Sequence, residues 1–308
     1  MVEVFKADDE FDFSFFCGSS CAFGVFDGLH KGHQYLLASA SNSAKASGGK
    51  SIALTFDIDP DEVFHPQRLK KLMTNDDRIK ALAQSGVDAV VVLPFTKEFS
   101  AQPPVDFLSK TFNGFPPAHL HIGSNFRFGV KASGTVAELD EWAACSGTKI
   151  HALDLQSEAG EPISSTRIRM LLSKANITKA NALLGHRYFI HSVVERGRGE
   201  GVDLGFRTAN LKLSTQMSVL CEGVYAAYCW VDEGCYKAAV SVGVSPMFKE
   251  GTTATSEVHI IDFSGDIYGK DIKVEFVEYL RPMIKFESKE KLIETVMGNI
   301  EWVRNNLS

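Results

Sequence analysis

The first half of the chain alternates between short apolar runs and segments in which apolar residues recur at helical spacing. The apolar runs predict strands over residues 20–26, 51–56, 88–93, 119–122 and 149–155. The segments between them predict helices over residues 32–47, 74–84, 103–112 and 135–144. Residues 1–19 are predicted to be an irregular lead-in or an edge strand. Alternation of strands and helices is typical of an open, parallel, Rossmann-like α/β sheet.

The pattern changes near residue 185. A short helix over residues 177–184 is predicted to end at Gly185, which can adopt the left-handed conformation of a helix C-cap. Strands rich in Val, Ile, Tyr and Phe are then predicted over residues 188–195, 223–231, 236–242, 257–263 and 272–279. A region of short strands predicts a small antiparallel β-barrel, and residues 288–304 predict a helix packed on it. The predicted domains are therefore 1–185 and 186–308.

Composition narrows the class of protein. The 308 residues are enough for two domains, and 44% hydrophobic with 23% charged residues is ordinary for a globular protein. The net charge of −6 and the lack of a long Lys/Arg run argue against a nucleic-acid partner. No apolar stretch predicts a membrane span, and the acidic first ten residues do not fit a secretory signal. We predict a cytoplasmic protein with small-molecule substrates, and the sequence leaves its oligomeric state open.

Six cysteines occur without any Cys-x-x-Cys pair, so neither a zinc site nor a disulfide framework is predicted. They are expected to be reduced, and mostly packed, side chains.

One segment carries the strongest chemical signal. Residues 23–33 read Phe-Gly-Val-Phe-Asp-Gly-Leu-His-Lys-Gly-His, between a predicted strand and a predicted helix. Backbone N–H groups at a helix N-terminus favour an anion, and imidazoles there can donate to phosphate oxygens. A turn with two incidental surface histidines is the alternative, but the glycines and Asp27 in the same junction favour phosphate binding. The candidate residues are Gly24, Phe26, Asp27, Gly28, His30, Gly32 and His33.

A second candidate for phosphate binding is the Ser164-Ser165-Thr166 cluster before an apolar helix. These hydroxyls could do no more than cap the helix. Arg167 and Arg169, however, lie in the first helical turn, where cations oppose the helix dipole. An anionic partner explains them more simply.

Two polar loops follow predicted strands, at the edge of a parallel sheet where ligands collect. Residues 57–62 are rich in carboxylates and read equally well as a ligand loop or as a solvated acidic loop. Residues 123–129 mix glycines with Asn125, Phe126 and Phe128, which predicts a second ligand loop.

Together, the His-x-Gly-His and Ser-Ser-Thr-x-Ile-Arg motifs resemble those of bacterial FAD synthetases, in the nucleotidyltransferase superfamily. The resemblance implies transfer of AMP from ATP to FMN, with release of pyrophosphate and formation of FAD. It places His30 and His33 at the α-phosphate and leaving group. It further assigns Ser165, Thr166 and Arg169 to the β- and γ-phosphates with Mg²⁺, and Asn125 to the substrate phosphate or ribose. Phe126 and Phe128 become candidate flavin contacts, and Asp59 stands where the family commonly has histidine.

The second half resembles the riboflavin kinase module that follows the synthetase module in the bacterial bifunctional enzyme. The resemblance rests on Leu204–Phe206, Thr208–Asn210, Gly223–Tyr225, Glu257–His259, Asp262-Phe263, Tyr268-Gly269, Leu280-Arg281 and Lys285-Phe286. It implies phosphorylation of riboflavin by ATP, with Arg281 as a flavin contact. Thr208 and Asn210 offer oxygen ligands suited to Mg²⁺ on a nucleotide. Glu257 is the candidate base, although such a carboxylate taken alone would read as a solvent-facing strand residue.

The kinase half departs from the family pattern at several positions. Arg207 replaces a proline, Glu200 and Val202 replace basic residues, and Met247 stands where threonine is expected. Loss of positive charge beside a triphosphate should weaken ATP binding, while Arg207 restores one charge nearby. Two alternatives therefore stay open: a synthetase whose barrel only binds flavin or regulates, and a nucleotidyltransferase for another phosphorylated acceptor.

Overall fold

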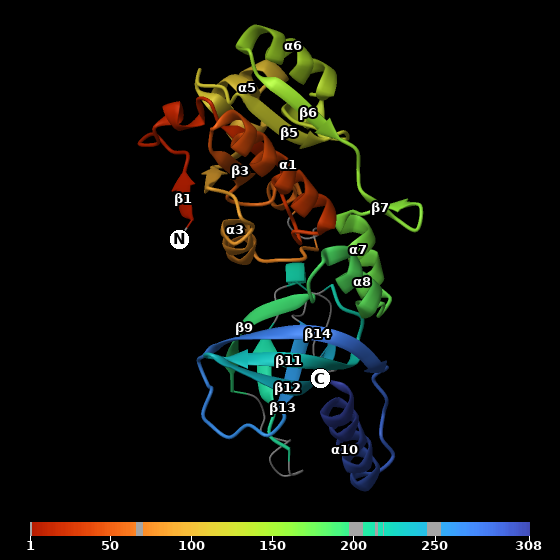
Figure 1. Cartoon of the computed structure of the whole chain (residues 1–308). Coiled ribbons are helices and arrows are strands. Elements are labelled where there is room, and N and C mark those ends of the chain that lie inside the picture. The colour runs from red at the N-terminus through yellow and green to blue at the C-terminus, as the bar shows by residue number, and fades with distance from the viewer. Residues whose placement is uncertain (1, 66–69, 197–205, 213–214, 218, 245–253) are drawn as a thin grey trace. The chain divides into compact units, whose positions relative to one another are not determined.

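The computed structural model describes residues 2–65, 70–196, 206–212, 215–217, 219–244 and 254–308 (Figure 1). The chain forms two compact units. The first unit comprises Met1–Leu69 and Thr74–Ser165, and the second comprises Lys70–Met73 and Thr166–Ser308. The predicted boundary at residue 185 stays a prediction.

A parallel sheet forms the centre of the first unit, in the order β1-β4-β3-β2-β5-β6. Its strands are β1 (Glu3–Lys6), β2 (Ser20–Phe23), β3 (Ser51–Phe56), β4 (Ala89–Leu93), β5 (His119–Gly123) and β6 (Lys149–Leu153). Every neighbouring pair is parallel, which confirms the predicted open α/β sheet. The lead-in contributes edge strand β1, where Val4 pairs with Val90 of β4.

Helices cover both faces of this sheet (Figure 1). Helix α1 (Lys31–Ser47) packs against β2, β3 and β5, and Gly48 ends it at φ 69°. On the other face, α5 (Pro104–Phe112) and α6 (Val136–Ser146) bury Phe107, Phe112 and Leu139 in the main core. The shorter elements are η1 (Phe13–Phe16), α2 (Pro60–Phe64), α3 (Asn75–Ala83), α4 (Lys97–Ser100), η2 (Val130–Ala132) and the hairpin β7 (Ser157–Glu158)–β8 (Glu161–Pro162).

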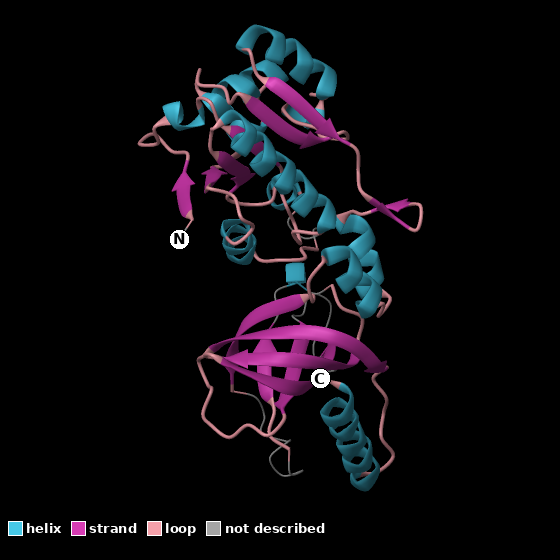
Figure 2. Ribbon diagram, in the orientation of Figure 1, coloured by secondary structure: helices cyan, strands magenta, loops and turns pink. Residues whose placement is uncertain are grey.

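The second unit is a closed barrel in the order β10-β13-β12-β11-β14-β9, with antiparallel neighbours, as predicted (Figure 2). Its strands are β9 (Phe189–Glu195), β10 (Ala209–Lys212), β11 (Gly223–Val231), β12 (Gly234–Val244), β13 (Ala254–Ile260) and β14 (Asp271–Arg281). Helix α10 (Lys289–Asn306) buries Ile300 and Val303 against Ala226 and Tyr228 of the barrel. The other elements are α7 (Ser165–Ser173), α8 (Ile177–Leu184) and η3 (Thr215–Met217).

Helices α7 and α8 are tied to the barrel. The Asn181 side chain donates to the Phe276 carbonyl (2.9 Å) and accepts from the Tyr188 N–H (2.7 Å). Cys221 N–H donates to the carbonyl of Leu172 on α7 (3.2 Å). Within helix α7, the first residue, Ser165, belongs to the first unit, and the remaining residues belong to the second unit.

Three local predictions need correction. Residues 60–64 form helix α2 rather than a loop. Strand β13 ends at Ile260, because Asp262 adopts a left-handed backbone (φ 57°) that cannot continue a strand. Strand β10 was missed because four residues are too few to show an alternating pattern.

Two chain-wide predictions can be compared with the structure. All six cysteines are free. The expectation that most of them are packed is wrong, because only Cys21 and Cys229 are buried and Cys17, Cys145 and Cys235 are exposed. Within the described residues, no helix is both long and apolar enough to cross a bilayer.

Candidate active sites

The turn between β2 and α1 has an unusual backbone. Phe26 (φ 62°), Gly28 (φ 78°) and Leu29 (φ 39°) all lie in the left-handed region, and Leu29 N–H closes the turn on the Phe26 carbonyl (3.0 Å). Side-chain-bearing residues rarely adopt this conformation, and it concentrates at functional sites. The fully buried Phe26 ring lies over Gly24, where a Cβ would approach Cζ of Phe26 to 3.3 Å. The close approach of this ring leaves little room for a side chain at position 24.

The two histidines of the motif stack at the start of α1. Their ring centroids are 3.6 Å apart with planes 17° from parallel, and the His33 ring meets Phe26 edge-on at 5.3 Å. His30 is the N-cap, since its Nδ1 accepts the His33 N–H (3.3 Å). A Cβ at Gly32 would come within 3.2 Å of the His30 ring, so the glycine admits the stack.

His33 is held neutral. Its Nδ1 is buried and has no hydrogen-bond partner among the described residues. Burial, followed by the neighbouring His30, holds the pKa of His33 well below its usual value. A neutral imidazole has one donor and one acceptor nitrogen.

The serine cluster joins this turn through Ser165. Its hydroxyl donates to the Asp27 carbonyl (2.8 Å), which links residues 138 positions apart in sequence. The structure thus brings Ser165 to the histidine turn. Phosphate binding by the two motifs stays a prediction. Thr166, Arg167 and Arg169 belong to the second unit, where Arg169 Nη2 donates to Thr166 Oγ1 (3.3 Å).

The loop after β5 lies beside the end of β2, its neighbour in the sheet. Phe126 packs on Phe23, the last residue of β2, with centroids 5.3 Å apart, and stacks with Phe128 at 5.8 Å. The Asn125 side chain folds over Gly123, whose Cβ would lie 3.0 Å from Oδ1. Phe126 is partly exposed and Phe128 is buried, and their assignment to flavin stays a prediction.

The carboxylate-rich segment after β3 starts helix α2. Asp59 accepts from Asp61 N–H (2.9 Å), Glu62 accepts from Asp59 N–H (3.1 Å), and Pro60 occupies the first turn. This capping box with a proline explains why the predicted loop is helical. Asp59 is buried, and desolvation raises its pKa. Neither a solvated loop nor an open ligand loop describes this residue.

Arg78 on α3 is the main residue of this region that the sequence did not suggest. Its side chain is buried, and its guanidinium reaches the ends of β2 and β3. The sequence did contain one indication that Arg78 is buried. It lies four residues before Leu82, which is fully buried, and therefore on the apolar face of the helix.

A separate histidine cluster lies on β5 and β6. His119 Nδ1 and His151 Nε2 are 2.9 Å apart, and the rings of His121 and His151 stack at 4.2 Å. Ser39 of α1 bonds His121 Nδ1 (3.1 Å), while His121 Nε2 is buried with no partner among the described residues. Burial, then His151 and His119, lowers the pKa of His121 to about 3. No metal-binding group of His, Cys, Asp or Glu side chains occurs in the described part of the chain.

In the barrel, strand register brings the predicted kinase residues together. Asn210 on β10 pairs with Glu257 on β13 and with Glu195 on β9. Directly paired residues share one face of a sheet, so Asn210, Glu257 and Glu195 lie on one face. Thr208 precedes β10, which begins at Ala209. Ala209 and Val258 are buried on the opposite face. Glu195 was not among the residues predicted from the sequence, and it joins this group because of the strand register.

Arg281, the predicted flavin contact, ends β14. Its Nε donates to Asn299 Oδ1 (2.9 Å), and its guanidinium lies 5.8 Å from the centre of the Phe286 ring. Arg207 is one of the positions where the kinase half departs from the family pattern. Its side chain is exposed, and its carbonyl accepts a hydrogen bond from His259 Nδ1 (2.8 Å). Glu200, Val202 and Met247 lie outside the described residues.

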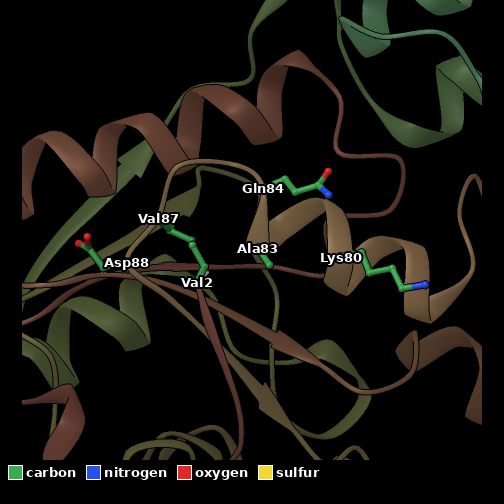
Figure 3. A pocket seen from close by; sticks show the side chains of 6 residues that line it. All are labelled: Val2, Lys80, Ala83, Gln84, Val87 and Asp88. Atoms are coloured by element: carbon green, nitrogen blue, oxygen red, sulfur yellow. The ribbon is translucent and has the colours of Figure 1, made fainter. Parts of the chain in front are cut away.

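A shallow cavity of about 590 Å³ lies elsewhere on the first unit (Figure 3). It opens beside the amino ends of β1 and β4, whereas the histidine turn follows the carboxyl end of β2. Its lining residues are Val2, Lys80, Ala83, Gln84, Val87 and Asp88. None of them belongs to the candidate active sites.

A parallel sheet with stacked histidines after β2, followed by an antiparallel barrel with an Asn–Glu pair across two strands, defines a nucleotidyltransferase joined to a kinase-type barrel. The FAD synthetase family model matches residues 14–167, and the riboflavin kinase family model matches residues 184–307. The chain belongs to the bifunctional riboflavin kinase/FMN adenylyltransferase family.

Individual relatives cover nearly all of the chain. The bifunctional riboflavin kinase/FMN adenylyltransferase of Listeria monocytogenes is 32% identical, over 88% of this chain and 87% of its own length. The Bacillus subtilis protein of that name is also 32% identical, over 90% and 89%. A crystal structure described as a macrolide-efflux protein from Streptococcus pneumoniae has a TM-score of 0.84 and 28% identity, and covers 94% of this chain and 95% of its own.

Proposed function

We propose that this chain makes FAD in two steps. The barrel unit phosphorylates riboflavin to FMN with ATP, and the first unit transfers AMP from a second ATP to FMN. The family models on both halves support the two activities together. They disfavour a barrel that only binds flavin. The observation that carries the adenylyl transfer is the stacked histidine pair at the left-handed turn after β2, in which burial lowers the pKa of His33.

In the adenylyl transfer, a phosphate oxygen of FMN attacks the α-phosphorus of ATP in line. A bond forms from that oxygen to phosphorus, the bond to the bridging oxygen breaks, and pyrophosphate leaves with the electron pair. The attacking oxygen is already anionic, so no protein nucleophile is needed. Catalysis then consists of positioning and charge stabilisation.

We assign the phosphates to the histidine turn and the serine cluster. His30 and His33 would hold the α-phosphate and leaving group. Ser165, Thr166 and Arg169 would bind the β- and γ-phosphates, with Ser164, Arg167 and the glycine turn beside them. The hydrogen bond from Ser165 to the Asp27 carbonyl supports the assignment of Ser165, because it holds that side chain at the histidine turn within the first unit.

The flavin of FMN would lie near the loop after β5. The partly exposed Phe126 offers a flat apolar surface, and Asn125 offers an amide for the FMN phosphate or ribose. The exposed Phe64 and the partly exposed Phe99 each pack on the buried Phe95, with centroids 6.0–6.3 Å apart.

In the kinase reaction, the 5′-hydroxyl of riboflavin would attack the γ-phosphorus of ATP. Glu257 would accept the hydroxyl proton, and ADP would leave. Arg281 would contact the flavin. The exposed Glu257 on the outer face of β13 can reach a bound substrate without opening the barrel.

Magnesium is the metal that these residues suit. Asn210 and the neighbouring Glu195 present amide and carboxylate oxygens on one face, and Thr208, just before β10, adds a hydroxyl. Oxygen donors of this kind are the ligands that Mg²⁺ prefers. When bound, Mg²⁺ would neutralise nucleotide phosphates in both reactions.

One assay tests both activities. The protein is incubated with Mg-ATP and either riboflavin or FMN, and the flavins are separated by chromatography. We expect FAD from FMN, and both FMN and FAD from riboflavin. Absence of FAD from FMN would reject the adenylyl transfer. If the protein bound riboflavin but formed no FMN, the barrel would be a binding module and not a kinase. A screen of other phosphorylated acceptors tests whether FMN is the acceptor of the adenylyl transfer.

A further inference from the structure

Arg78 is a buried cation that connects three segments of the first unit. The side chain is 2% exposed, and desolvation lowers its pKa. Its guanidinium donates to oxygens of Val25 (3.0 Å), Thr55 (2.6 Å), Phe56 (2.8 Å), Asp57 (3.4 Å) and Asn75 (3.3 Å). Burial of a charge is costly unless its donors are satisfied, so such a network needs a reason beyond filling space.

The contact with Val25 concerns the active site directly. Val25 precedes Phe26, the first left-handed residue of the histidine turn, and its carbonyl receives Arg78 Nη1. Thr55 reinforces this contact, because its hydroxyl accepts from Arg78 and donates to the same Val25 carbonyl (3.3 Å). The turn is thereby fixed to the end of β3 by a rigid planar group.

The remaining contacts hold the other side of the guanidinium. Nη2 donates to the carbonyls of Phe56 and Asp57, where β3 ends, and to the Asn75 side chain in the first turn of α3. Both nitrogens therefore have fixed partners, and the group cannot rotate without breaking several hydrogen bonds.

We propose that Arg78 is a positioning residue for adenylyl transfer. It holds the Val25 carbonyl and with it the left-handed turn that presents His30 and His33. It touches no substrate and acts only through the backbone of the turn. The inference rests on the proposed adenylyl transfer by the first unit.

The test compares Arg78→Lys and Arg78→Met with the unmodified chain. Lysine keeps the charge but lacks the planar fork, and methionine removes both. Either substitution should let the turn move by about an ångström. We therefore expect kcat for FAD synthesis to fall about tenfold in Arg78→Lys and about 100-fold in Arg78→Met. The KM for FMN should change little. Amide exchange over residues 26–33 should speed up in both variants.

Two controls separate positioning from loss of stability. Leu82→Ala removes a fully buried side chain from the same helix and supplies a destabilised reference, and Lys80→Met removes an exposed cation two residues from Arg78 (Figure 3). All variants are assayed well below their melting temperatures. Riboflavin phosphorylation, proposed for the other unit, is measured on the same preparations and should not change.

Each outcome has a clear reading. If the unmodified chain makes no FAD from FMN, the proposed function itself fails. If it does, and the Arg78 variants keep kcat within about twofold of it, Arg78 does not position the turn. An equal loss of kcat in Leu82→Ala, or unchanged amide exchange over residues 26–33 in the Arg78 variants, would also overturn the inference.

Discussion

His30 Nδ1 accepts the backbone N–H of His33, which leaves the proton of a neutral His30 ring on Nε2. One side chain therefore both caps helix α1 and presents a donor at the turn. Asparagine can place an acceptor near the position of Nδ1 but has nothing at Nε2, so the two roles can be separated by substitution.

We expect His30→Asn to lower kcat for FAD synthesis by about 10²–10³-fold, the usual effect of removing one transition-state donor. Its melting temperature should stay close to that of the unmodified protein, because the cap is kept. His30→Ala should lose the same activity and, in addition, about 1 kcal/mol of stability with the cap. Chromatography of flavins and thermal unfolding measure the two effects, and full FAD synthesis by both variants would exclude His30 from the reaction.

Glu257→Gln should affect the other activity. Loss of the proposed base predicts a fall in riboflavin phosphorylation of about 10²–10⁴-fold, while FAD synthesis from supplied FMN is unchanged. Glu278→Gln on β14, an exposed carboxylate of the same barrel, is the matched control. Normal phosphorylation by Glu257→Gln would remove that residue from the mechanism.

The histidine cluster predicts a loss of stability in acid. His121, with a pKa of about 3 when folded, binds a proton near pH 6.5 once unfolded, so its contribution is complete above pH 6.5. Below that pH the unfolded state binds more protons, and stability falls by up to ~1.4 kcal/mol per pH unit from this group, as far as about pH 3. Burial, then His119 and Lys149, also lowers the pKa of His151, which steepens the loss.

Urea unfolding between pH 7 and pH 4 measures this slope. His121→Gln should flatten it, whereas His65→Gln, at an exposed histidine of the same unit, should leave it unchanged. An equal slope in the His121 variant would mean that other groups cause the acid sensitivity.

Asp59 should matter for stability through its cap. Asp59→Ala removes the side chain that starts α2 and should cost about 0.5–2 kcal/mol, whereas Asp59→Asn keeps an acceptor and should cost less. Asp61→Ala, two residues along and exposed, is the control for loss of a carboxylate. The midpoint of urea unfolding reports the difference, and equal midpoints for Asp59→Ala and Asp61→Ala would show that the cap contributes nothing.

Local signals explain what the sequence could predict. The glycines at 24 and 32 were part of the motif that predicted phosphate binding, and the structure shows the Phe26 and His30 rings 3.2–3.3 Å from where a Cβ would lie. The sequence also held a signal for α2, because Asp59-Pro60 followed by Glu62 is a capping box, but the run of carboxylates favoured a loop. That helix could have been predicted.

Other features depend on contacts that sequence spacing does not contain. The hydrogen bonds of Arg78 join residues up to 53 positions apart, and the Asn210–Glu195 pairing is set by barrel closure. His121 and His151 meet only because β5 and β6 are parallel neighbours in one register. Such residues look ordinary in sequence until the sheet order is known.

The left-handed backbone at Phe26 and Leu29 also bears on how tightly a ligand can bind. These conformations are unfavourable for residues with side chains, and folding imposes them before any nucleotide arrives. If this turn binds phosphate as proposed, binding has little loop ordering to oppose it, which favours affinity. Part of the conformational stability of the first unit would in this way be converted into pre-organisation of its proposed phosphate site.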